Sequence, residues 1–317
     1  MGSNPTPGTL YVLLVILSPL PIDPSLVALF PGQGSISAGA ARKWHGQESW
    51  SLISEISSIA SRDVEELLLE GSDEDLIETD NAQIATFALS LVSWMSWRSA
   101  NAADAGFALG HSLGEISALV ASGIMSLEDG VSLVVSRGNA MRIAADHTPG
   151  SMVALMGGSI NNLDQLLTCE GLWLANLNGE GQIVVSGTLE AMENIRNVHR
   201  NFGWRRATAL PVGGAFHSPL MSGAQTSLDD ALSKINFQRG RFLVSSNVEG
   251  RVLDSDADWR DLLSRQMTAP VRFYDCVNSL PSTVTSTIEM APGGVLTGLV
   301  KRIRDFSSHV ITDEVRE

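Results

Sequence analysis

Ser112 stands between two glycines in the segment GHSLGE, residues 110–115. A short apolar run precedes this segment (residues 105–109), and the residues that follow it (116–121) predict a helix. A serine between glycines at a strand–helix junction is typical of a nucleophile elbow, whose tight turn lifts the serine oxygen clear of the backbone. The helix that begins there would direct free N–H groups at developing negative charge. Ordinary strand–helix turns have the same spacing, so the serine alone does not establish chemistry.

A nucleophilic serine needs a base, and the sequence offers six histidines. His111 is next to the serine, but adjacent side chains at an elbow point apart. His217 lies in the glycine-rich segment LPVGGAFHSPLM (residues 210–221), between a predicted strand and a predicted helix. As a general base it would take the proton of Ser112 and return it to a leaving group. The remaining histidines lie in polar, loop-like or terminal segments that predict solvated side chains: His45, His147, His199 and His309.

Two further features each allow more than one interpretation. Residues 26–30 predict a short buried strand that runs into PGQGS, residues 31–35. The backbone N–H groups of that turn either face a ligand or simply connect a strand to a helix. Arg137 falls inside a predicted helix, residues 127–145, among apolar neighbours. A cation there has a partner or reaches solvent, and a structural salt bridge is the simplest interpretation.

The composition is that of an ordinary globular protein of 317 residues, 44% of them hydrophobic and 18% charged. This length is sufficient for one large domain with a smaller one attached. The net charge of −14 argues against a nucleic-acid ligand, because a phosphate backbone would be repelled. Cys169 and Cys276 have no metal-ligand spacing and predict small hydrophobic side chains in a reducing compartment. With no metal-ligand cluster and no dinucleotide fingerprint, we expect no metal and no cofactor.

We interpret residues 1–25 as an added N-terminal arm. Its apolar run, residues 10–17, is far shorter than the roughly 20 residues that a membrane span needs. No Lys or Arg precedes that run, as a secretory signal would require. Pro19, Pro21 and Pro24 then break any helix, so we expect the arm to pack on the domain as an edge strand. We expect a cytoplasmic monomer with no membrane partner.

The periodicity of the chain predicts an α/β protein with an inserted subdomain. Residues 152–210 have the order β-α-β-β-α-β, which is that of a ferredoxin-like unit. We expect helices at residues 47–70, 81–98, 127–145, 161–167, 189–201, 222–234, 258–265 and 295–304. We expect strands at residues 26–30, 105–109, 152–156, 172–175, 182–186, 205–210, 242–245 and 286–290.

These elements divide the chain into two predicted units. The larger is an α/β-hydrolase-like (patatin-like) domain with a mostly parallel central sheet, formed by residues 26–147 and 211–304. The smaller is a ferredoxin-like subdomain, residues 148–210, that interrupts it. The polar residues 305–317 predict a C-terminal tail that frays.

Three segments occur in the order and spacing found in the malonyl-CoA:acyl carrier protein transacylases and in the related acyltransferase domains of fatty acid and polyketide synthases. They are FPGQGS (30–35), GHSLGE (110–115) and GAFHSP (214–219). Further matches are SRG (136–138) with Met141, NLN (176–178), GQIVVSG (181–187), RQ (265–266) with PV (270–271), and PGGVLTGL (292–299). The chain resembles this family from about residue 27 to residue 304.

The resemblance implies a Ser-His dyad that forms an acyl ester. Ser112 would attack the thioester of an acyl-CoA, and His217 would be its base. The backbone carbonyl of Gln266 would orient that histidine, in place of an Asp. The backbone N–H groups of Gln33 and Leu113 would bind the oxyanion of the tetrahedral intermediate.

The resemblance also implies an acidic acyl group. Arg137 would pair with the free carboxylate of malonyl, because a planar guanidinium grips a carboxylate with two parallel hydrogen bonds. Leu113 and Phe216 match the malonyl type more than the methylmalonyl type. His111, Asn178 and Phe216 are expected to support the site.

The implied substrates are malonyl-CoA and the phosphopantetheine thiol of an acyl carrier protein, in a ping-pong exchange that serves fatty acid or polyketide synthesis. Carrier proteins of this kind are acidic, as is this chain, so docking needs a local basic patch. The candidates, which are otherwise solvated surface charges, are Arg205, Arg206, Lys301, Arg302 and Arg304. Two alternatives stay open: a serine hydrolase that uses the same elbow, and a non-catalytic homologue that only binds a carrier protein.

Overall fold

The computed structural model describes residues 19–254 and 256–311, which form two β-sheets. The larger sheet has six strands in the order β10-β9-β1-β2-β7-β8. All neighbours pair in parallel except β8, which is antiparallel to β7. The strands are β1 (Ile22–Phe30), β2 (Asp104–Gly110), β7 (Leu243–Ser246), β8 (Arg251–Leu253), β9 (Ser286–Glu289) and β10 (Ser307–Val310). The fold is therefore α/β with a mainly parallel sheet, as the sequence predicts.

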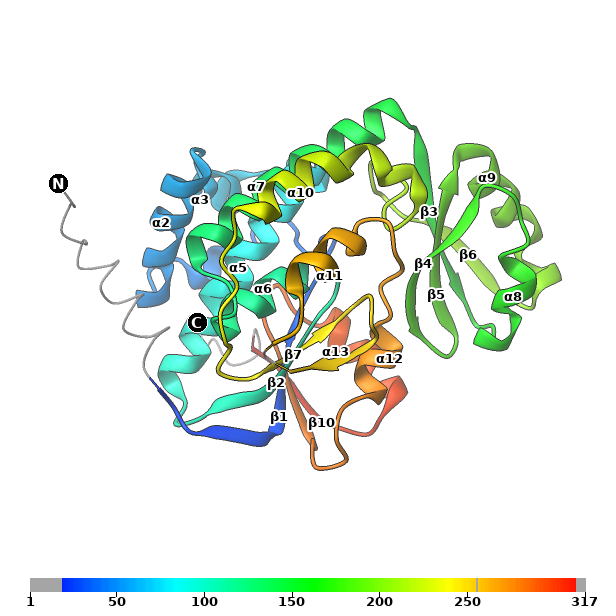
Figure 1. Ribbon diagram of the computed structural model, residues 1–317. Helices are drawn as coiled ribbons and strands as arrows, with labels where there is room; N and C mark the ends of the chain where they lie inside the picture. Colours follow the sequence, from blue (N-terminus) through cyan, green and yellow to red (C-terminus); the bar gives the residue numbers. More distant parts are fainter. Residues whose placement is uncertain (1–18, 255, 312–317) are drawn as a thin grey trace.

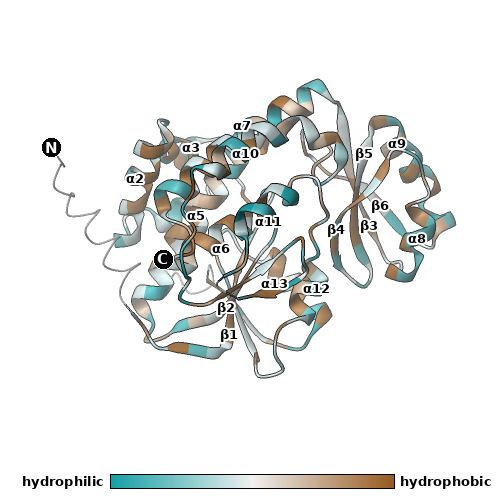
Figure 2. Ribbon diagram, viewed as in Figure 1, coloured by the Kyte–Doolittle hydropathy of each residue, from teal (hydrophilic) through white to brown (hydrophobic). Residues whose placement is uncertain are grey.

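Helices cover both faces of this sheet (Figure 1). In β1, Ala28 and Phe30 belong to one hydrophobic core and Val27 and Leu29 to another, because successive side chains of a strand point to opposite faces. The first core is completed by α2 (Ser51–Ala60), α3 (Val64–Glu70), α5 (Thr79–Ala100), α6 (Leu113–Ser122), α7 (Leu127–His147), α10 (Gln225–Ser233) and α11 (Trp259–Gln266). The second is completed by α12 (Phe273–Asn278) and α13 (Val295–Ile303). In Figure 2 the fully buried α6 is mostly brown, whereas α11 is largely teal.

The smaller sheet is antiparallel, in the order β4-β5-β3-β6, and lies at one end of the molecule (green in Figure 1). Its strands are β3 (Gly150–Met156), β4 (Leu172–Gly179), β5 (Gln182–Thr188) and β6 (Arg206–Ala209). α8 (Leu163–Leu166) follows β3, and α9 (Leu189–Val198) follows β5. Side chains such as Val153, Val185 and Trp204 form a core that is separate from the other two.

A backbone bridge joins the small sheet to the large unit. The N–H of Val271, just before α12, donates to the carbonyl of Ala175 in β4 (2.8 Å). The N–H of Leu177 donates back to the carbonyl of Val271 (2.9 Å). Asn176 lies between these two hydrogen bonds, so its backbone is fixed where the small sheet meets the large unit.

The N-terminal strand differs from its prediction. β1 begins at Ile22, so residues 22–25 of the expected arm are part of a strand of the large sheet; Ile22 and Asp23 pair with β2, and the register with β9 begins at Leu26. A register shift against β2 between Asp23 and Val27 accommodates Pro24, which has no N–H to donate. Residues 1–18 of the expected arm lie outside the described residues. No helix in the described ranges is long and apolar enough to cross a membrane.

Five other segments also differ from their predictions. The helix expected at residues 47–70 divides into η2 (Glu48–Trp50), α2 and α3, because Ser61 is left-handed (φ 52°) and Asp63 caps α3. The expected fraying tail is wrong for residues 307–310, which pair with β9 as strand β10 between buried Phe306 and Ile311. The helices expected at residues 161–167, 189–201 and 222–234 each include a 3₁₀ turn. Those three turns are η3 (Ile160–Asn162), η4 (His199–Phe202) and η5 (Pro219–Ala224). The sequence analysis did not predict four elements of the structure: η1 (Arg42–Trp44), α4 (Asp73–Ile77), β8 and α12.

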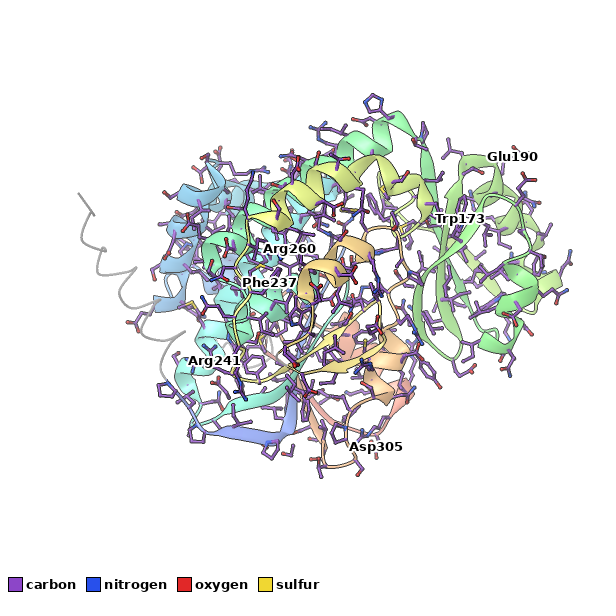
Figure 3. The ribbon with its side chains drawn as sticks, viewed as in Figure 1. Trp173, Glu190, Phe237, Arg241, Arg260 and Asp305 are labelled. Carbon is purple, nitrogen blue, oxygen red and sulfur yellow. The ribbon has the colours of Figure 1, made fainter. Side chains whose placement is uncertain are left out.

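The side chain of Arg260, in α11, forms hydrogen bonds at the C-terminal end of α10 (Figure 3). Its guanidinium donates to the carbonyl oxygens of Leu232 (3.1 Å) and Ile235 (2.7 Å), and it lies 5.7 Å from the centre of the Phe237 ring. The last carbonyls of a helix have no partner within the helix, so a cation there stabilises it. α11 ends at Gln266, so this contact holds the helix that carries Gln266 to the site.

Candidate active site

The site lies where the carboxyl ends of three neighbouring strands meet. Gln33 follows β1, Ser112 follows β2, and Asn247 follows β7. In open parallel sheets, ligands bind at this edge. The tight turn at Ser112 depends on its glycines: a Cβ added to Gly110 would lie 2.1 Å from the backbone of residues 114–115, and one on Gly114 would lie 2.0 Å from the carbonyl oxygen of residue 30.

Ser112 has a strained backbone that Asn247 holds through two hydrogen bonds at and just before the serine. Its φ of 52° and ψ of −110° are unfavourable for a residue with a side chain, and such strain persists only where the surroundings impose it. The Asn247 side-chain oxygen accepts the N–H of Ser112 (2.7 Å), and its amide nitrogen donates to the carbonyl of Gly110 (2.7 Å). The elbow thus owes its geometry to β7 as well as to β2 and α6.

Ser112 and His217 lie in direct contact and are 7% and 5% exposed. The Ser112 Oγ is 2.7 Å from His217 Nε2, and His217 Nδ1 is 2.9 Å from the backbone carbonyl oxygen of Gln266. A carbonyl can only accept, so Nδ1 carries the proton and Nε2 has the free lone pair facing the serine hydroxyl. Burial, followed by the charge of Arg137, lowers the pKa of His217 to about 3. The imidazole is therefore neutral at rest and free to accept a proton.

Arg137 projects from the middle of α7 beside the serine. Its guanidinium donates to Ser112 Oγ (3.1 Å), to the side-chain oxygen of Gln266 (3.1 Å) and to that of Gln83 (2.5 Å). It is 2% exposed, and no carboxylate of the described residues lies within 4.0 Å of it. The salt bridge that the sequence favours as the simplest interpretation is thus absent there. Burial lowers the Arg137 pKa to about 10, so the group stays charged at neutral pH.

The two predicted oxyanion donors belong to different segments, Gln33 to the turn after β1 and Leu113 to the start of α6. Leu113 is the first residue of α6, so its N–H has no acceptor within the helix. The Gln33 side chain accepts a hydrogen bond from Gln83, which in turn holds Arg137. The arginine and the turn after β1 are therefore linked through one amide side chain on α5.

A cavity of about 80 Å³ opens in front of the dyad. Polar groups from Gln33, Ser112, His217 and Asn176 face it, and its apolar wall comes from Met141, Met152, Leu210, Val212 and Phe216. The buried side-chain oxygen of Asn176 has no hydrogen-bond partner among the described residues. The cavity is thus small and largely apolar, and it is lined by residues of the large unit and of the small sheet.

His111 and Asn178 form a second contact between those units. His111 Nε2 is 2.9 Å from the side-chain oxygen of Asn178 at the end of β4. Burial lowers the pKa of His111, so this imidazole is neutral and donates from Nε2. His111 also lines the cavity in front of Ser112. Phe216 precedes His217 and is buried in the cavity wall.

The five basic residues predicted to dock a carrier protein lie elsewhere, and none lines the cavity. Arg205, Arg206, Lys301 and Arg302 are exposed, and Arg302 donates to the side chain of Gln182 (2.9 Å). Arg304 is half-buried and donates to the carbonyls of residues 280, 281 and 284. Arg304 therefore tethers the end of α13 to a neighbouring loop.

Sequence reasoning missed four polar residues of the site: Gln83, Glu115, Asn176 and Asn247. Glu115 and Asn176 belong to segments already matched to the family, but neither had an assigned contact. Asn247 follows a predicted strand, and polar residues at the carboxyl ends of parallel strands point to a site. Gln83 lies in a helix that is buried all round, where a polar residue needs a partner. No group of three or more His, Cys, Asp or Glu in the described residues could hold a metal ion.

Comparison with known proteins assigns the chain to a family. Residues 27–311 match the acyl transferase domain. The chain belongs to the acyl transferase family. It is 38% identical over 283 residues to a malonyl CoA-acyl carrier protein transacylase from Bacillus subtilis (strain 168), covering 87% of this chain and 89% of that one.

Solved structures of this family have the same fold. A malonyl-CoA:acyl carrier protein transacylase from Xanthomonas oryzae pv. oryzae superposes with a TM-score of 0.86 at 33% identity, covering 92% of this chain and 95% of that one. A malonyl-transacylase solved in complex with its type II polyketide acyl-carrier protein has a TM-score of 0.85 at 31% identity, covering 90% and 95%.

Proposed function

We propose that this acyl transferase moves a malonyl group from malonyl-CoA to the phosphopantetheine thiol of an acyl carrier protein, supplying fatty acid or polyketide synthesis. Arg137 is the observation that carries the proposal. A buried guanidinium that has no carboxylate of the described residues within 4.0 Å, and that lies 3.1 Å from the nucleophilic oxygen, fits an acyl group that brings its own carboxylate. An acetyl group would leave that cation unpaired.

The first half-reaction forms a malonyl ester on Ser112. Its Oγ attacks the thioester carbon while His217 Nε2 takes the hydroxyl proton. The N–H groups of Gln33 and Leu113 stabilise the oxyanion of the tetrahedral intermediate. The intermediate collapses by breaking the carbon–sulfur bond, and the imidazolium gives its proton to the departing CoA thiolate. The depressed pKa of His217 favours this return of the proton.

The second half-reaction runs the same steps in reverse with a different thiol. His217 takes the proton of the phosphopantetheine thiol, the sulfur attacks the ester carbon, and the Ser112 oxygen leaves with that proton. The complex of a related malonyl-transacylase with its acyl-carrier protein supports a carrier protein as the second substrate.

Hydrolysis is the weaker alternative for the same elbow. The His217 Nδ1 partner is a backbone carbonyl, whereas a hydrolase triad would place a carboxylate there. The apolar cavity wall disfavours a water molecule near the ester. A hydrolase also gives no reason for the buried charge of Arg137.

We also infer the domain division and the docking face. Residues 148–210 form a ferredoxin-like subdomain, which the strand order β4-β5-β3-β6 with helices after β3 and β5 supports. Residues 26–147 and 211–304 form the α/β-hydrolase-like (patatin-like) domain, which the strand–elbow–helix of β2 and α6 supports. The carrier protein docks on Arg205, Arg206, Lys301 and Arg302, whose exposure supports this role.

Intact-mass analysis tests the function. After incubation with malonyl-CoA, we expect a malonyl adduct on Ser112 that holo-carrier protein removes faster than water does. Ser112→Ala should form no adduct. Rapid loss of the adduct to water would indicate a hydrolase, and absence of any adduct on the intact enzyme would indicate a non-catalytic homologue.

A further inference from the structure

Glu115 is a buried carboxyl group that the proposed reaction does not use. It lies in the first turn of α6, three residues after the nucleophile, and is 1% exposed. An ionised carboxyl group is costly to bury unless it is paired and hydrogen-bonded. Its position at a helix N-terminus, where the helix dipole favours negative charge, reduces that cost.

Both oxygens of Glu115 accept hydrogen bonds from residues of the site. One accepts the backbone N–H of Asn247 (3.1 Å), and the other accepts the side-chain amide of Gln266. These two donors come from different parts of the chain, the end of β7 and the end of α11. Glu115 therefore fixes two separate segments against the elbow.

Each of those two residues holds reacting groups. Asn247 binds the backbone N–H of Ser112 and the carbonyl of Gly110 just before it. Gln266 orients His217 through its backbone carbonyl (2.9 Å), and its side-chain oxygen accepts from Arg137 (3.1 Å). The same Gln266 amide also donates to the Ser112 carbonyl (3.1 Å). All three functional side chains are thus held by residues that Glu115 holds.

We propose that Glu115 is a positioning residue whose carboxylate aligns the serine, the histidine and the arginine through Asn247 and Gln266. It does not touch the acyl group. A carboxylate suits this role because both of its partners are N–H donors. A glutamine side chain in its place would put its own NH₂ group against one of those donors. The proposal rests on the proposed function only for the identity of the acyl donor.

Protonation of Glu115 would weaken this arrangement. Burial raises its pKa to about 7, against the hydrogen bonds from Gln266 and Asn247 and the charge of Arg137. The charged or titratable groups facing it are Arg137 from α7 and the Cys276 thiol from α12. Burial raises the pKa of Cys276 to about 12, so neither group changes charge near neutral pH. We therefore expect Glu115 to lose its charge, and the alignment to weaken, as the pH falls through about 7, whereas His111, whose pKa is lowered from its usual value, gains a proton only at lower pH.

Two rates test the proposal: malonyl-adduct formation on Ser112, and labelling of Ser112 by phenylmethylsulfonyl fluoride, which needs no malonyl recognition. For Glu115→Gln we expect both first-order rates to fall about 10- to 100-fold, as for loss of hydrogen bonds to a charged group. The KM for malonyl-CoA should change little. The wild-type inflection near pH 7 should disappear in this variant.

Glu289→Gln is the matched control. Glu289 is also fully buried and accepts two backbone N–H groups, from Leu296 (2.9 Å) and Thr297 (2.7 Å), at the start of α13. This variant should match Glu115→Gln in its loss of stability while keeping the wild-type rates and pH profile. Equal loss of both rates in the two variants would reduce Glu115 to a structural role.

Gln266→Leu provides a second test that does not require Glu115→Gln to fold. Removing the amide donor takes away a hydrogen bond that lowers the Glu115 pKa, so the acid-side inflection should move to higher pH. An unchanged inflection, or a flat wild-type labelling profile across neutral pH, overturns the proposal. Failure of wild-type protein to form a malonyl adduct while the sulfonyl fluoride labels it as expected would refute only the proposed acyl donor.

Discussion

If the proposed function is right, replacing Arg137 with alanine should reverse a preference for malonyl over acetyl. The guanidinium is buried, it has no carboxylate partner in the described residues, and it contacts the nucleophilic oxygen at 3.1 Å. In the variant, a malonyl carboxylate would enter the same cavity with no cation to receive it. An uncompensated buried charge costs about 3 to 5 kcal/mol, so kcat/KM for malonyl-CoA should fall by roughly two to three and a half orders of magnitude.

Acetyl-CoA should behave in the opposite way. It brings no carboxylate, so it loses nothing when Arg137 is removed, and its kcat/KM should stay level or rise. The assay is transfer to holo-carrier protein from either acyl-CoA, read by mass, with the ratio of the two kcat/KM values as the result. Arg137→Lys should give an intermediate ratio, because an ammonium group keeps the charge but cannot form the planar pair of hydrogen bonds.

The ratio separates specificity from damage to the fold. Arg137→Ala also leaves the side-chain oxygens of Gln83 and Gln266 without their donor, so both acyl-CoA rates can fall together with stability. A fall that affects malonyl and acetyl transfer equally leaves the ratio of the two kcat/KM values unchanged. A malonyl-to-acetyl ratio equal to that of the wild type would refute the role of Arg137 and with it the argument for an acidic acyl group.

Three further outcomes are expected. The imidazole of His217 should remain neutral from about pH 5 to 8 in an NMR titration, because its pKa is lowered to about 3, and Arg137→Ala should raise that pKa by removing a nearby positive charge. Asp104→Ala should lower the free energy of unfolding by about 3 to 5 kcal/mol in a urea titration, because it breaks a buried ion pair with the Arg98 guanidinium (2.6 Å). Lys301→Glu should raise the KM for carrier protein while sparing that for malonyl-CoA.

Each of these has its own control. An imidazole that titrates near its ordinary value would contradict the environment described for His217. For stability, Arg142→Ala removes an exposed pair with Asp146 and should cost no more than about 1 kcal/mol. For docking, Arg304→Glu should lower stability, since that residue binds three backbone carbonyls. Equal effects of Lys301→Glu on both substrates would remove Lys301 from the docking face.

Most of the α/β fold could be predicted because its signals are local. The apolar run of β1 and the helix around Arg137 depend on neighbours within a few residues, which periodicity captures. The strand β10 could not be predicted, because the letters SSHV form a strand only by pairing with β9. The interior position of β1 likewise depends on its pairing with β2 and β9, which are distant from β1 in sequence.

The sequence by itself determined the elbow. The serine between glycines, after an apolar run and before a predicted helix, is typical of a nucleophile elbow, and the structure agrees, since a Cβ at Gly110 or Gly114 would clash with nearby backbone. It also determined which residue types were available as base and as cation. These properties need no knowledge of how distant segments pack.

Only the tertiary structure decided how Ser112 is used. The serine meets His217 across 105 positions of sequence and Gln266 across 154, and these distances close only when the whole sheet assembles. That no carboxylate of residues 19–254 and 256–311 lies within 4.0 Å of Arg137 is likewise a property of packing, because it depends on where distant segments lie. Hydrogen bonds and burial depend on which residues lie close together in space. The sequence by itself does not specify which distant residues become neighbours.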